Sequence, residues 1–358
     1  MNLYEEVRPG SNRYINGLDL NKELLDYLDE FNNVVIVTGD VSYKIFNDYY
    51  KGHLDYPVYH YDHSASEENA IELVNQIKEA DAILAIGAGK LIDTGKMVAD
   101  KLNAKLVVLP TLVSNCAPYA PLSVIYDRNH KFLRYDMFKE ANYLVLIDYQ
   151  LLLQTPKDYL VAGIGDTLAK WVEIDGITSS IDSATYNATL LMGIASAKLC
   201  LDILNEDSVG ALEALTKQEV NPSFIRVVDT IIAIAGCVGG FAHKYGRVSG
   251  AHAIHNALSI EASTHDILHG SKVAYGVLVQ LAYLNKYKDI DELVKLYKEI
   301  GLPYSLKQLN IDLENKDLIK EISNIAANEK ETFLLIDKEV TCDKIVLAIN
   351  NLETYLSK

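Results

Sequence analysis

Four of the nine histidines of this 358-residue chain fall within one stretch, GAHAIHNALSIEASTHDILHG at residues 250–270. They are His252, His255, His265 and His269. Imidazole is the commonest metal ligand in proteins and a frequent proton carrier, so the cluster indicates a chemical site. His252 and His255 are three residues apart on an expected helix and share a face. They are therefore either two ligands, or one ligand and a neighbour that handles a proton.

A carboxylate that would complete a metal site lies upstream, in the sequence GIGDTLAKWVE. Asp166 is expected at or near the start of a helix, where its simplest role is to cap that helix. Two imidazoles and one carboxylate also form a ligand set suited to catalytic Zn²⁺ or Fe²⁺, with a position left open for substrate. We therefore interpret Asp166, His252 and His269 as ligands of one divalent metal ion.

A glycine-rich turn, GAGK at residues 87–90, is a second candidate site. It follows an apolar segment expected to be a buried strand and precedes a segment of helical composition. Backbone N–H groups at the start of such a helix bind phosphate, and Lys90 adds positive charge. The dinucleotide fingerprint G-x-G-x-x-G is incomplete because Ile92 replaces its third glycine, and the Walker motif does not fit either. An ordinary turn between strand and helix is the alternative interpretation.

The segment from Thr111 to Tyr126 is a candidate ligand-binding loop, because it follows an expected buried strand and is rich in proline and small polar residues. Cys116 within it is a candidate nucleophile. No base is placed near it in the sequence, so an inert thiol is the simpler interpretation.

Short apolar segments alternate with helix-compatible segments in the first part of the chain, which predicts an open α/β sheet. Strands are expected at residues 33–38, 58–61, 82–86, 105–109, 122–126 and 143–147. A helix is expected over Ser66–Glu79, with Ser66 as its cap. The sequence Thr155-Pro156-Lys157-Asp158 is typical of a helix start, and helical spacing prevails after it. We therefore predict an α/β domain over residues 1–155 and an all-helical domain over residues 156–358.

The composition excludes several classes of protein. A formal net charge of −16 argues against binding to nucleic acid or to an anionic membrane. The longest apolar run, residues 231–242, is too short to span a bilayer and is interpreted as a buried helix. The first residues lack the pattern of a signal peptide, and the four cysteines have no paired spacing, so a cytoplasmic protein without disulfides is expected.

Taken together, these motifs resemble the iron-containing alcohol dehydrogenase family, specifically its glycerol dehydrogenase-like branch. The resemblance rests on GAGKLIDTGK, PTLVSNCAPYAPLSVIY, AGIGDTLAKW and the segment from AHAIHNALS to LHG, in the family's order and spacing. It implies a nicotinamide dinucleotide-binding α/β domain followed by a helical metal-binding domain, the fold shared with dehydroquinate synthase. It also implies a homo-oligomer that acts on a small hydroxy or carbonyl compound.

Carried over by position, the resemblance makes Asp166, His252 and His269 the metal ligands. It assigns the cofactor pyrophosphate to the turn formed by Gly87, Ala88, Gly89 and Lys90. Thr111, Ser114, Leu122 and Tyr126 would lie along the rest of the cofactor.

Four positions depart from the family pattern. Lys170 stands where iron-dependent members have a further histidine ligand, which favours Zn²⁺ over Fe²⁺. Ala88 replaces the middle glycine of the usual turn. Gly39, with Asp40 next to it, replaces an aspartate that binds the ribose hydroxyls in NAD-preferring relatives, so both NAD and NADP are candidates. Cys116 replaces an aspartate that binds substrate hydroxyls in glycerol dehydrogenases, and SNCA is closer to enzymes of 2-oxo and 2-hydroxy acids.

The resulting prediction is a metal-dependent NAD(P) oxidoreductase that interconverts a small, glycerol-like alcohol and its ketone or aldehyde. The cofactor is expected in a cleft between the domains, with its nicotinamide facing the metal. His255 is expected either to relay the proton or to orient a ligand. A 2-oxo acid reductase, a dehydroquinate synthase-like cyclase and a non-catalytic NAD-binding sensor are the alternatives.

Overall fold

The computed structural model describes residues 6–20, 23–52 and 54–357. The chain forms two compact units. The sheet unit comprises Arg8–Pro156 together with Glu213–Gly240, and the helical unit contains Lys157–Leu212 and the chain from Phe241 onward. The division after Pro156 lies next to the boundary expected at residue 155, whereas the return of residues 213–240 to the sheet unit was not foreseen.

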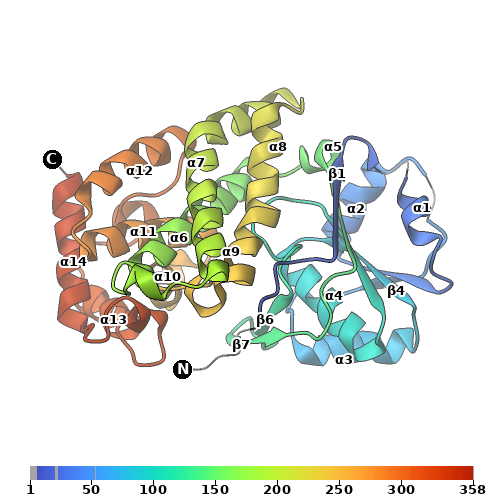
Figure 1. Cartoon of the computed structure of the whole chain (residues 1–358), viewed down its shortest axis with the longest axis horizontal. Coiled ribbons are helices and arrows are strands. Elements are labelled where there is room, and N and C mark those ends of the chain that lie inside the picture. Colours follow the sequence, from blue (N-terminus) through green and yellow to red (C-terminus); the bar gives the residue numbers. More distant parts are fainter. Residues whose placement is uncertain (1–5, 21–22, 53, 358) are drawn as a thin grey trace. The chain divides into compact units, whose positions relative to one another are not determined.

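Six parallel strands form the central sheet of the sheet unit, in the order β1-β8-β5-β4-β2-β3 (Figure 1). Their bounds are β1 Arg13–Gly17, β2 Val34–Thr38, β3 Val58–His60, β4 Ala82–Gly87, β5 Lys105–Pro110 and β8 Leu144–Asp148. The helices between and after them are α1 Leu24–Leu28, α2 Asp40–Tyr49, α3 Glu67–Ile77, α4 Gly89–Leu102 and α5 Tyr149–Leu152. The α/β prediction for this region is confirmed.

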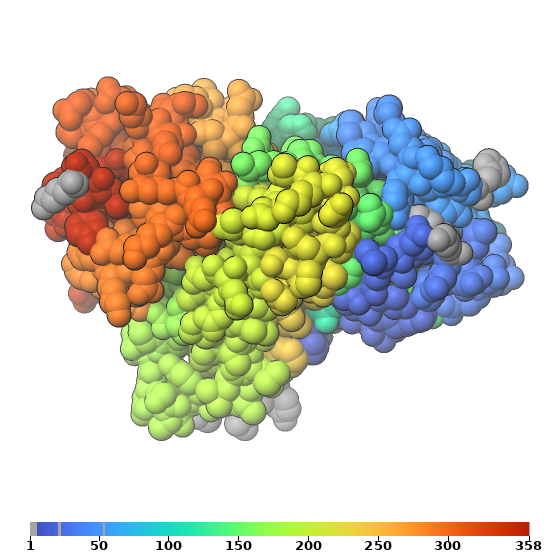
Figure 2. All heavy atoms as spheres, turned by 90° about the horizontal axis from the view of Figure 1, so that it is seen from above, coloured from blue at the N-terminus to red at the C-terminus, as the bar shows by residue number. Residues whose placement is uncertain are grey.

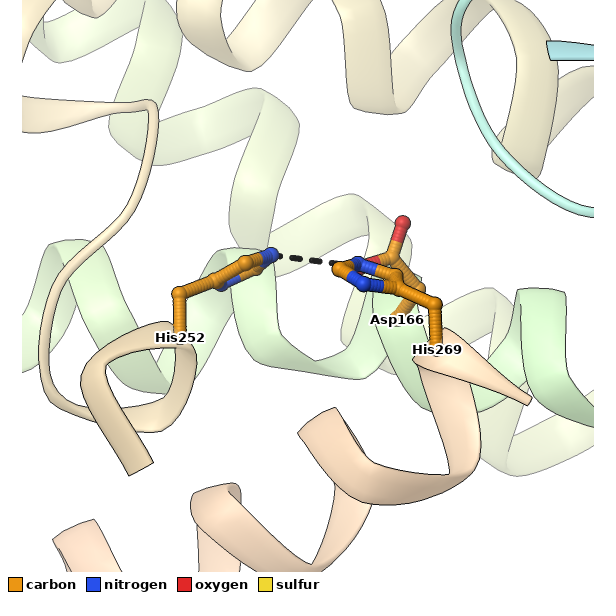
Figure 3. A group of neighbouring side chains, drawn as sticks. All are labelled: Asp166, His252 and His269. Atoms are coloured by element: carbon orange, nitrogen blue, oxygen red, sulfur yellow. Dashed lines mark hydrogen bonds and ion pairs between the residues drawn. The ribbon is translucent and has the colours of Figure 1, made fainter. Parts of the chain in front are cut away.

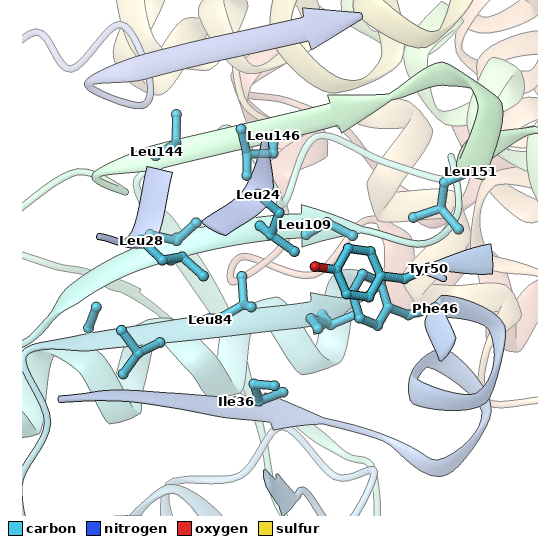
Figure 4. Packing of buried hydrophobic residues seen from close by; sticks show 14 residues of the cluster. Leu24, Leu28, Ile36, Phe46, Tyr50, Leu84, Leu109, Leu144, Leu146 and Leu151 are labelled. Atoms are coloured by element: carbon cyan, nitrogen blue, oxygen red, sulfur yellow. The ribbon is translucent and has the colours of Figure 1, made fainter. Parts of the chain in front are cut away.

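The apolar runs in β4 and β5 are explained by helices on both faces of the sheet. Alternate residues of β4 point to opposite faces. Leu84 belongs to a buried cluster that includes residues of α1 and α2, among them Leu28 and Phe46 (Figure 4). Ala85 points to the other face, where a Cβ on Gly95 of α4 would lie 3.0 Å from its own Cβ. The glycine in α4 thus permits close packing of the helix on the strand.

The sequence analysis did not predict two of the strands, and one strand that it did predict lies outside the six-stranded sheet. β1 is a partly exposed edge strand with the sequence RYING, and β7 (Phe132–Met137) is largely exposed, so neither has a buried apolar run. β6 (Leu122–Tyr126) was expected as a strand, but it pairs antiparallel with β7 in a separate two-stranded sheet. Adjacent strands in sequence favoured this local hairpin over a place in the parallel sheet.

The helical unit contains no strand among its described residues. Its α-helices include α6 Lys157–Thr178, α10 Gly250–Leu258, α11 His269–Tyr283, α12 Tyr287–Ile300, α13 Lys316–Ala326 and α14 Cys342–Leu356. α11 is mostly apolar and is buried along most of its length, which is expected of a central helix. Figure 1 shows α6, α10 and α11 together within this unit.

Two further helical segments are apolar enough and long enough to resemble membrane spans, which by itself is weak evidence. One, Pro222–Tyr245, includes the run predicted to be a buried helix and contains α8 (Pro222–Asp229), a π-helical turn and α9 (Ala235–Ala242). Most of its apolar window is buried. The other, α7 (Ala188–Lys217), exposes Leu191, Met192 and Leu199. This part of the chain is yellow-green on the face shown in Figure 2.

Candidate metal centre and cofactor site

Asp166 lies in the middle of α6, so the prediction that it opens a helix is wrong. The glycines of GIGD suggested a helix boundary, but Gly165 is required inside the helix for packing. A Cβ on Gly165 would lie 2.7 Å from the carbonyl oxygen of Gly270, and one on Gly270 would overlap Ala162. These two glycines let α6 and α11 approach closely, which brings Asp166 beside His269, the first residue of α11.

Asp166, His252 and His269 converge in the helical unit (Figure 3). Oδ1 of Asp166 lies 3.2 Å from Nε2 of His269 and 3.4 Å from Nε2 of His252. One ligand atom from each residue lies within 4.8 Å of the other two. Asp166 and His252 are buried, whereas the His269 side chain is 51% exposed. In the part of the chain that the structure describes, no other His, Cys, Asp and Glu side chains converge in this way.

The charges around this cluster suit a divalent cation. Burial opposes ionisation of Asp166, but its hydrogen bonds to His252 and His269 outweigh burial and hold the pKa of the carboxyl well below its usual range. Burial likewise opposes protonation of His252, but Glu173 and Asp166 outweigh it and raise the pKa of the imidazole to about 9. Without a metal, a proton therefore occupies the position at which a cation would bind, and the two compete.

The outer nitrogens of both imidazoles are held by neighbours, which leaves both Nε2 atoms facing Asp166. Nδ1 of His252 lies 3.0 Å from each oxygen of Glu173. Nδ1 of His269 lies 2.9 Å from Nε2 of His255. Such outer contacts fix the tautomer and ring orientation of metal-binding histidines. The three residues therefore form a ligand set with two nitrogens and one oxygen, which fits zinc or ferrous iron.

His255 lies behind His269 rather than among the converging atoms. Burial and the neighbouring charges of His269, His252 and Lys272 hold the pKa of His255 well below its usual range. A neutral His255 accepts a hydrogen bond from Nδ1 of His269 through Nε2. Of the two roles expected for it, this geometry favours orientation of a ligand. His265, the fourth histidine of the stretch, instead contacts the Ser259 carbonyl at 3.2 Å.

The predicted phosphate-binding turn lies in the sheet unit, between β4 and α4. No side chain caps the N-terminus of α4, so its first N–H groups are available to an anion. A Cβ on Gly89 would lie 2.8 Å from the amide nitrogen of Asn115, which places that amide over the turn. Ala88 has an extended backbone with φ of −120°, so the loss of the family's middle glycine is tolerated there.

Lys90 and Tyr126 lie together at this turn. The Lys90 ammonium is 5.2 Å from the centre of the Tyr126 ring and 3.3 Å from Nδ1 of His130, at the end of the β6–β7 hairpin. Burial lowers the pKa of Lys90, and burial raises that of Tyr126 to about 12. Thr111 donates its backbone N–H to the Gly87 carbonyl at 3.1 Å. Sequence reasoning assigned no role to His130, which belongs to no motif, and none to Asn115, although Asn115 lies in the motif PTLVSNCAPYAPLSVIY.

The remaining predicted cofactor residues are distributed along the same unit. Ser114 lies in the loop between β5 and β6, as does the candidate nucleophile Cys116, and Leu122 begins β6. The Leu122 carbonyl accepts a 2.6 Å hydrogen bond from the ammonium of Lys96. That ammonium also pairs at 3.0 Å with Asp93, so a buried ion pair in α4 anchors the start of β6.

Comparison with known proteins identifies the family. The model of the iron-containing alcohol dehydrogenases matches residues 11–149. Hydroxycarboxylate dehydrogenase A of Escherichia coli is 36% identical over 77% of this chain and 76% of its own length. Glycerol dehydrogenase of Thermotoga maritima is 34% identical over 78% of this chain and 76% of its own. The chain belongs to the iron-containing alcohol dehydrogenase family.

Solved structures agree with this assignment at the level of the fold. A probable glycerol dehydrogenase from Sinorhizobium meliloti superposes with a TM-score of 0.86 over 98% of this chain and 99% of its own, at 24% identity. Glycerol dehydrogenase from Schizosaccharomyces pombe gives 0.87 over 99% of this chain and 91% of its own, also at 24% identity. The predicted combination of an α/β domain with a helical domain is thus confirmed.

Two departures of this family member from the expected pattern now have a structural description. The ammonium of Lys170 donates to the carbonyl of Arg247 at 3.0 Å. Gly39 caps α2 at the end of β2, and a Cβ there would lie 2.8 Å from the ring of Tyr61. A carboxylate is nevertheless present at this strand end, because Asp40 follows and contacts Nδ1 of His60 at 2.6 Å.

Proposed function

We propose that this protein is a metal-dependent, NAD(P)-linked dehydrogenase that interconverts a small, glycerol-like alcohol and its ketone or aldehyde. The observation that carries the proposal is the convergence of Asp166, His252 and His269 in a member of the iron-containing alcohol dehydrogenase family. The glycerol dehydrogenases among the relatives support the substrate class. A homo-oligomer in the cytoplasm remains our prediction.

We infer that Asp166, His252 and His269 hold Zn²⁺. The lysine at position 170 supports zinc over iron, since its ammonium is a donor, carries no free lone pair and is bonded to a backbone carbonyl. Gly87, Ala88, Gly89 and Lys90 would hold the phosphates of the dinucleotide, next to the Asn115 amide, and Thr111 would lie along the rest of the cofactor. Gly39, Ser114, Leu122 and Tyr126 are assigned to the rest of the cofactor.

A metal held by Asp166, His252 and His269 would supply a Lewis acid for the substrate oxygen, and a nicotinamide cofactor would supply or take up the hydride. The protein's own groups prepare this chemistry. Asp166 stays ionised despite its burial, so it places negative charge at the centre before any ligand arrives. His255, held neutral, orients His269 through its outer nitrogen and is not required to carry the substrate proton.

A 2-oxo acid reductase is the second candidate function. Hydroxycarboxylate dehydrogenase A is 36% identical to this chain, which supports it. Cys116 also supports it, because a thiol at the position of a substrate-binding aspartate offers only a weak hydrogen bond to a polyol and does not repel a carboxylate. Asp40, exposed at the end of β2, supports NAD rather than NADP, since it would repel a 2′-phosphate.

One assay separates these proposals. Zinc-loaded protein receives NADH or NADPH with dihydroxyacetone, 2-oxobutyrate or a simple aldehyde, and cofactor oxidation is followed. Turnover of dihydroxyacetone supports the glycerol-like function, whereas preferential turnover of 2-oxobutyrate supports the second candidate. Absence of turnover with every substrate contradicts both dehydrogenase proposals and favours the alternatives, a cyclase or a non-catalytic NAD-binding sensor. A His252→Ala variant, measured beside it, identifies turnover that does not depend on the metal centre.

A further inference from the structure

We propose that Glu173 is a positioning residue of the metal centre, whose single carboxylate orients the His252 imidazole and anchors the helix that carries it. This inference rests on the proposed metal site formed by Asp166, His252 and His269. No motif singled out Glu173, although it closes the sequence GIGDTLAKWVE that contains Asp166.

Glu173 lies on α6, two helical turns beyond Asp166, so both side chains lie on the same face of the helix. It is 2% exposed. A buried carboxylate is costly unless hydrogen bonds satisfy it, and here they do. Its Oε1 accepts from the backbone N–H of Ser249 at 2.6 Å, from that of His252 at 3.1 Å, and from Nδ1 of His252 at 3.0 Å. Oε2 is also 3.0 Å from Nδ1.

The two backbone contacts replace a missing local cap. α10 begins at Gly250, and the side chain of Ser249, at the capping position, does not bond to the first turn. The first N–H groups of a helix have no partner within it, so a buried helix start needs outside acceptors. Glu173 accepts two of these N–H groups, and Oε1 of Gln280 from α11 accepts that of Ala251 at 2.9 Å. Two neighbouring helices therefore anchor the start of α10.

The contact between Glu173 and Nδ1 of His252 determines which nitrogen of the imidazole faces Asp166. Oε1 of Glu173 already accepts two backbone N–H groups and both carboxyl oxygens lie 3.0 Å from Nδ1 of His252, so the geometry assigns a proton on Nδ1 that is donated to Glu173. When a cation replaces the proton on Nε2, the lone pair of that nitrogen is available to bind it, and Nε2 faces Asp166 at 3.4 Å. Glu173 also makes the imidazole a better donor to a cation, because its charge stabilises positive charge on the ring. Since Asp166 and Glu173 share one helix, α6 sets the positions of two of the three proposed ligands.

The test compares two variants that remove different anchors of the same helix end. Glu173→Gln removes the charge and disturbs the contact with the His252 imidazole. Gln280→Met removes a hydrogen-bonded cap of α10 without touching that imidazole. Zinc affinity is measured by competition with a chromogenic chelator, and the Tm of the metal-free protein is measured in parallel. We expect Glu173→Gln to weaken zinc binding about 10–100-fold. We expect Gln280→Met to lower Tm while zinc affinity stays within about threefold of wild type.

Zinc affinity that is unchanged in Glu173→Gln, or reduced no more than in Gln280→Met, would overturn the proposal. His252→Ala separates this failure from failure of the metal site itself, because that variant must lose zinc binding if the site is correct. Should Glu173→Gln not fold, nitrogen-15 NMR of the zinc-loaded wild-type protein decides instead. The proposal requires zinc on Nε2 of His252 with a proton on Nδ1, and zinc on Nδ1 contradicts it.

Discussion

The metal centre and the glycine turn are built in opposite ways. The metal centre uses side chains from three helices, of which α6 lies far from α10 and α11 in the sequence, and the outer nitrogens of its two histidines contact Glu173 and His255. The turn uses consecutive residues between β4 and α4 and offers backbone N–H groups. The first site depends on tertiary packing of helices, whereas the second depends on local chain geometry. Changes at the two sites should therefore have separate and recognisable effects.

Loss of a metal ligand should produce the largest effect. His252→Ala removes a nitrogen donor and leaves Glu173 and Asp166 buried without the imidazole between them. We expect zinc binding to be lost and turnover to fall to background, while binding of NADH is retained because the glycine turn is in the other unit. Metal analysis after gel filtration and fluorescence titration with NADH measure both. Full zinc occupancy in an active variant would remove His252 from the ligand set.

A side chain in the glycine turn should have the converse effect. Gly89→Val would place Cβ about 2.8 Å from the Asn115 amide and would crowd the path to the N–H groups. We expect the KM for NADH to rise at least tenfold, with zinc affinity unchanged. Ala88→Gly is the matched control, and we expect it to change KM less than twofold because the Ala88 backbone is extended. Equal effects of the two substitutions would contradict the proposed cradle.

The pH dependence of zinc binding should report the metal centre alone. In the metal-free protein the pKa of His252 is raised from 6.5 to about 9, so zinc must displace a proton below that pH. Apparent zinc affinity should rise up to tenfold per pH unit from neutral pH and level off near pH 9. The raised pKa also stabilises the metal-free fold below about pH 6.5, and this contribution is lost as the pH rises through about 9. Chelator competition and urea unfolding at several pH values measure the two trends. A flat affinity profile would contradict this assignment of His252.

A substitution in the core of the sheet unit should lower the stability of the protein while having little effect on the metal centre or the glycine turn. Leu84 is fully buried in β4, the strand that leads to the glycine turn. Leu84→Ala should lower the free energy of unfolding by about 2–5 kcal/mol through lost burial and a cavity. Zinc affinity should be unchanged, and the KM for NADH should change only a few-fold. Urea unfolding measures the first effect, and a large loss of zinc affinity would show that the two sites are not independent.

The same contrast explains what the sequence could predict. The strands β4 and β5, the helix α3 with its Ser66 cap and the glycine turn are local features, and periodicity or capping chemistry indicated each. The place of Asp166 was mispredicted because Gly165 looked like a helix boundary. Gly165 instead permits close packing of α6 against Gly270 of α11, and α11 lies more than a hundred residues later in the sequence.

Other features were missed for the same physical reason. No sequence pattern indicated a role for Glu173, and only the position of α10 shows that it reaches His252. His130 reaches Lys90 because the β6–β7 hairpin folds over the turn, and β7 lacks the buried apolar run that identifies a strand. Both depend on how elements pack, whereas the motifs containing His252 and His269 were recognisable along the chain.

Reconstitution with zinc is the sharpest test of whether Asp166, His252 and His269 hold one catalytic metal ion. Protein stripped with a chelator is titrated with zinc while turnover of dihydroxyacetone and of 2-oxobutyrate is followed with NADH. We expect no activity without metal and a linear return of activity that reaches its maximum at one zinc ion per chain. Full activity in rigorously metal-free protein would contradict this assignment.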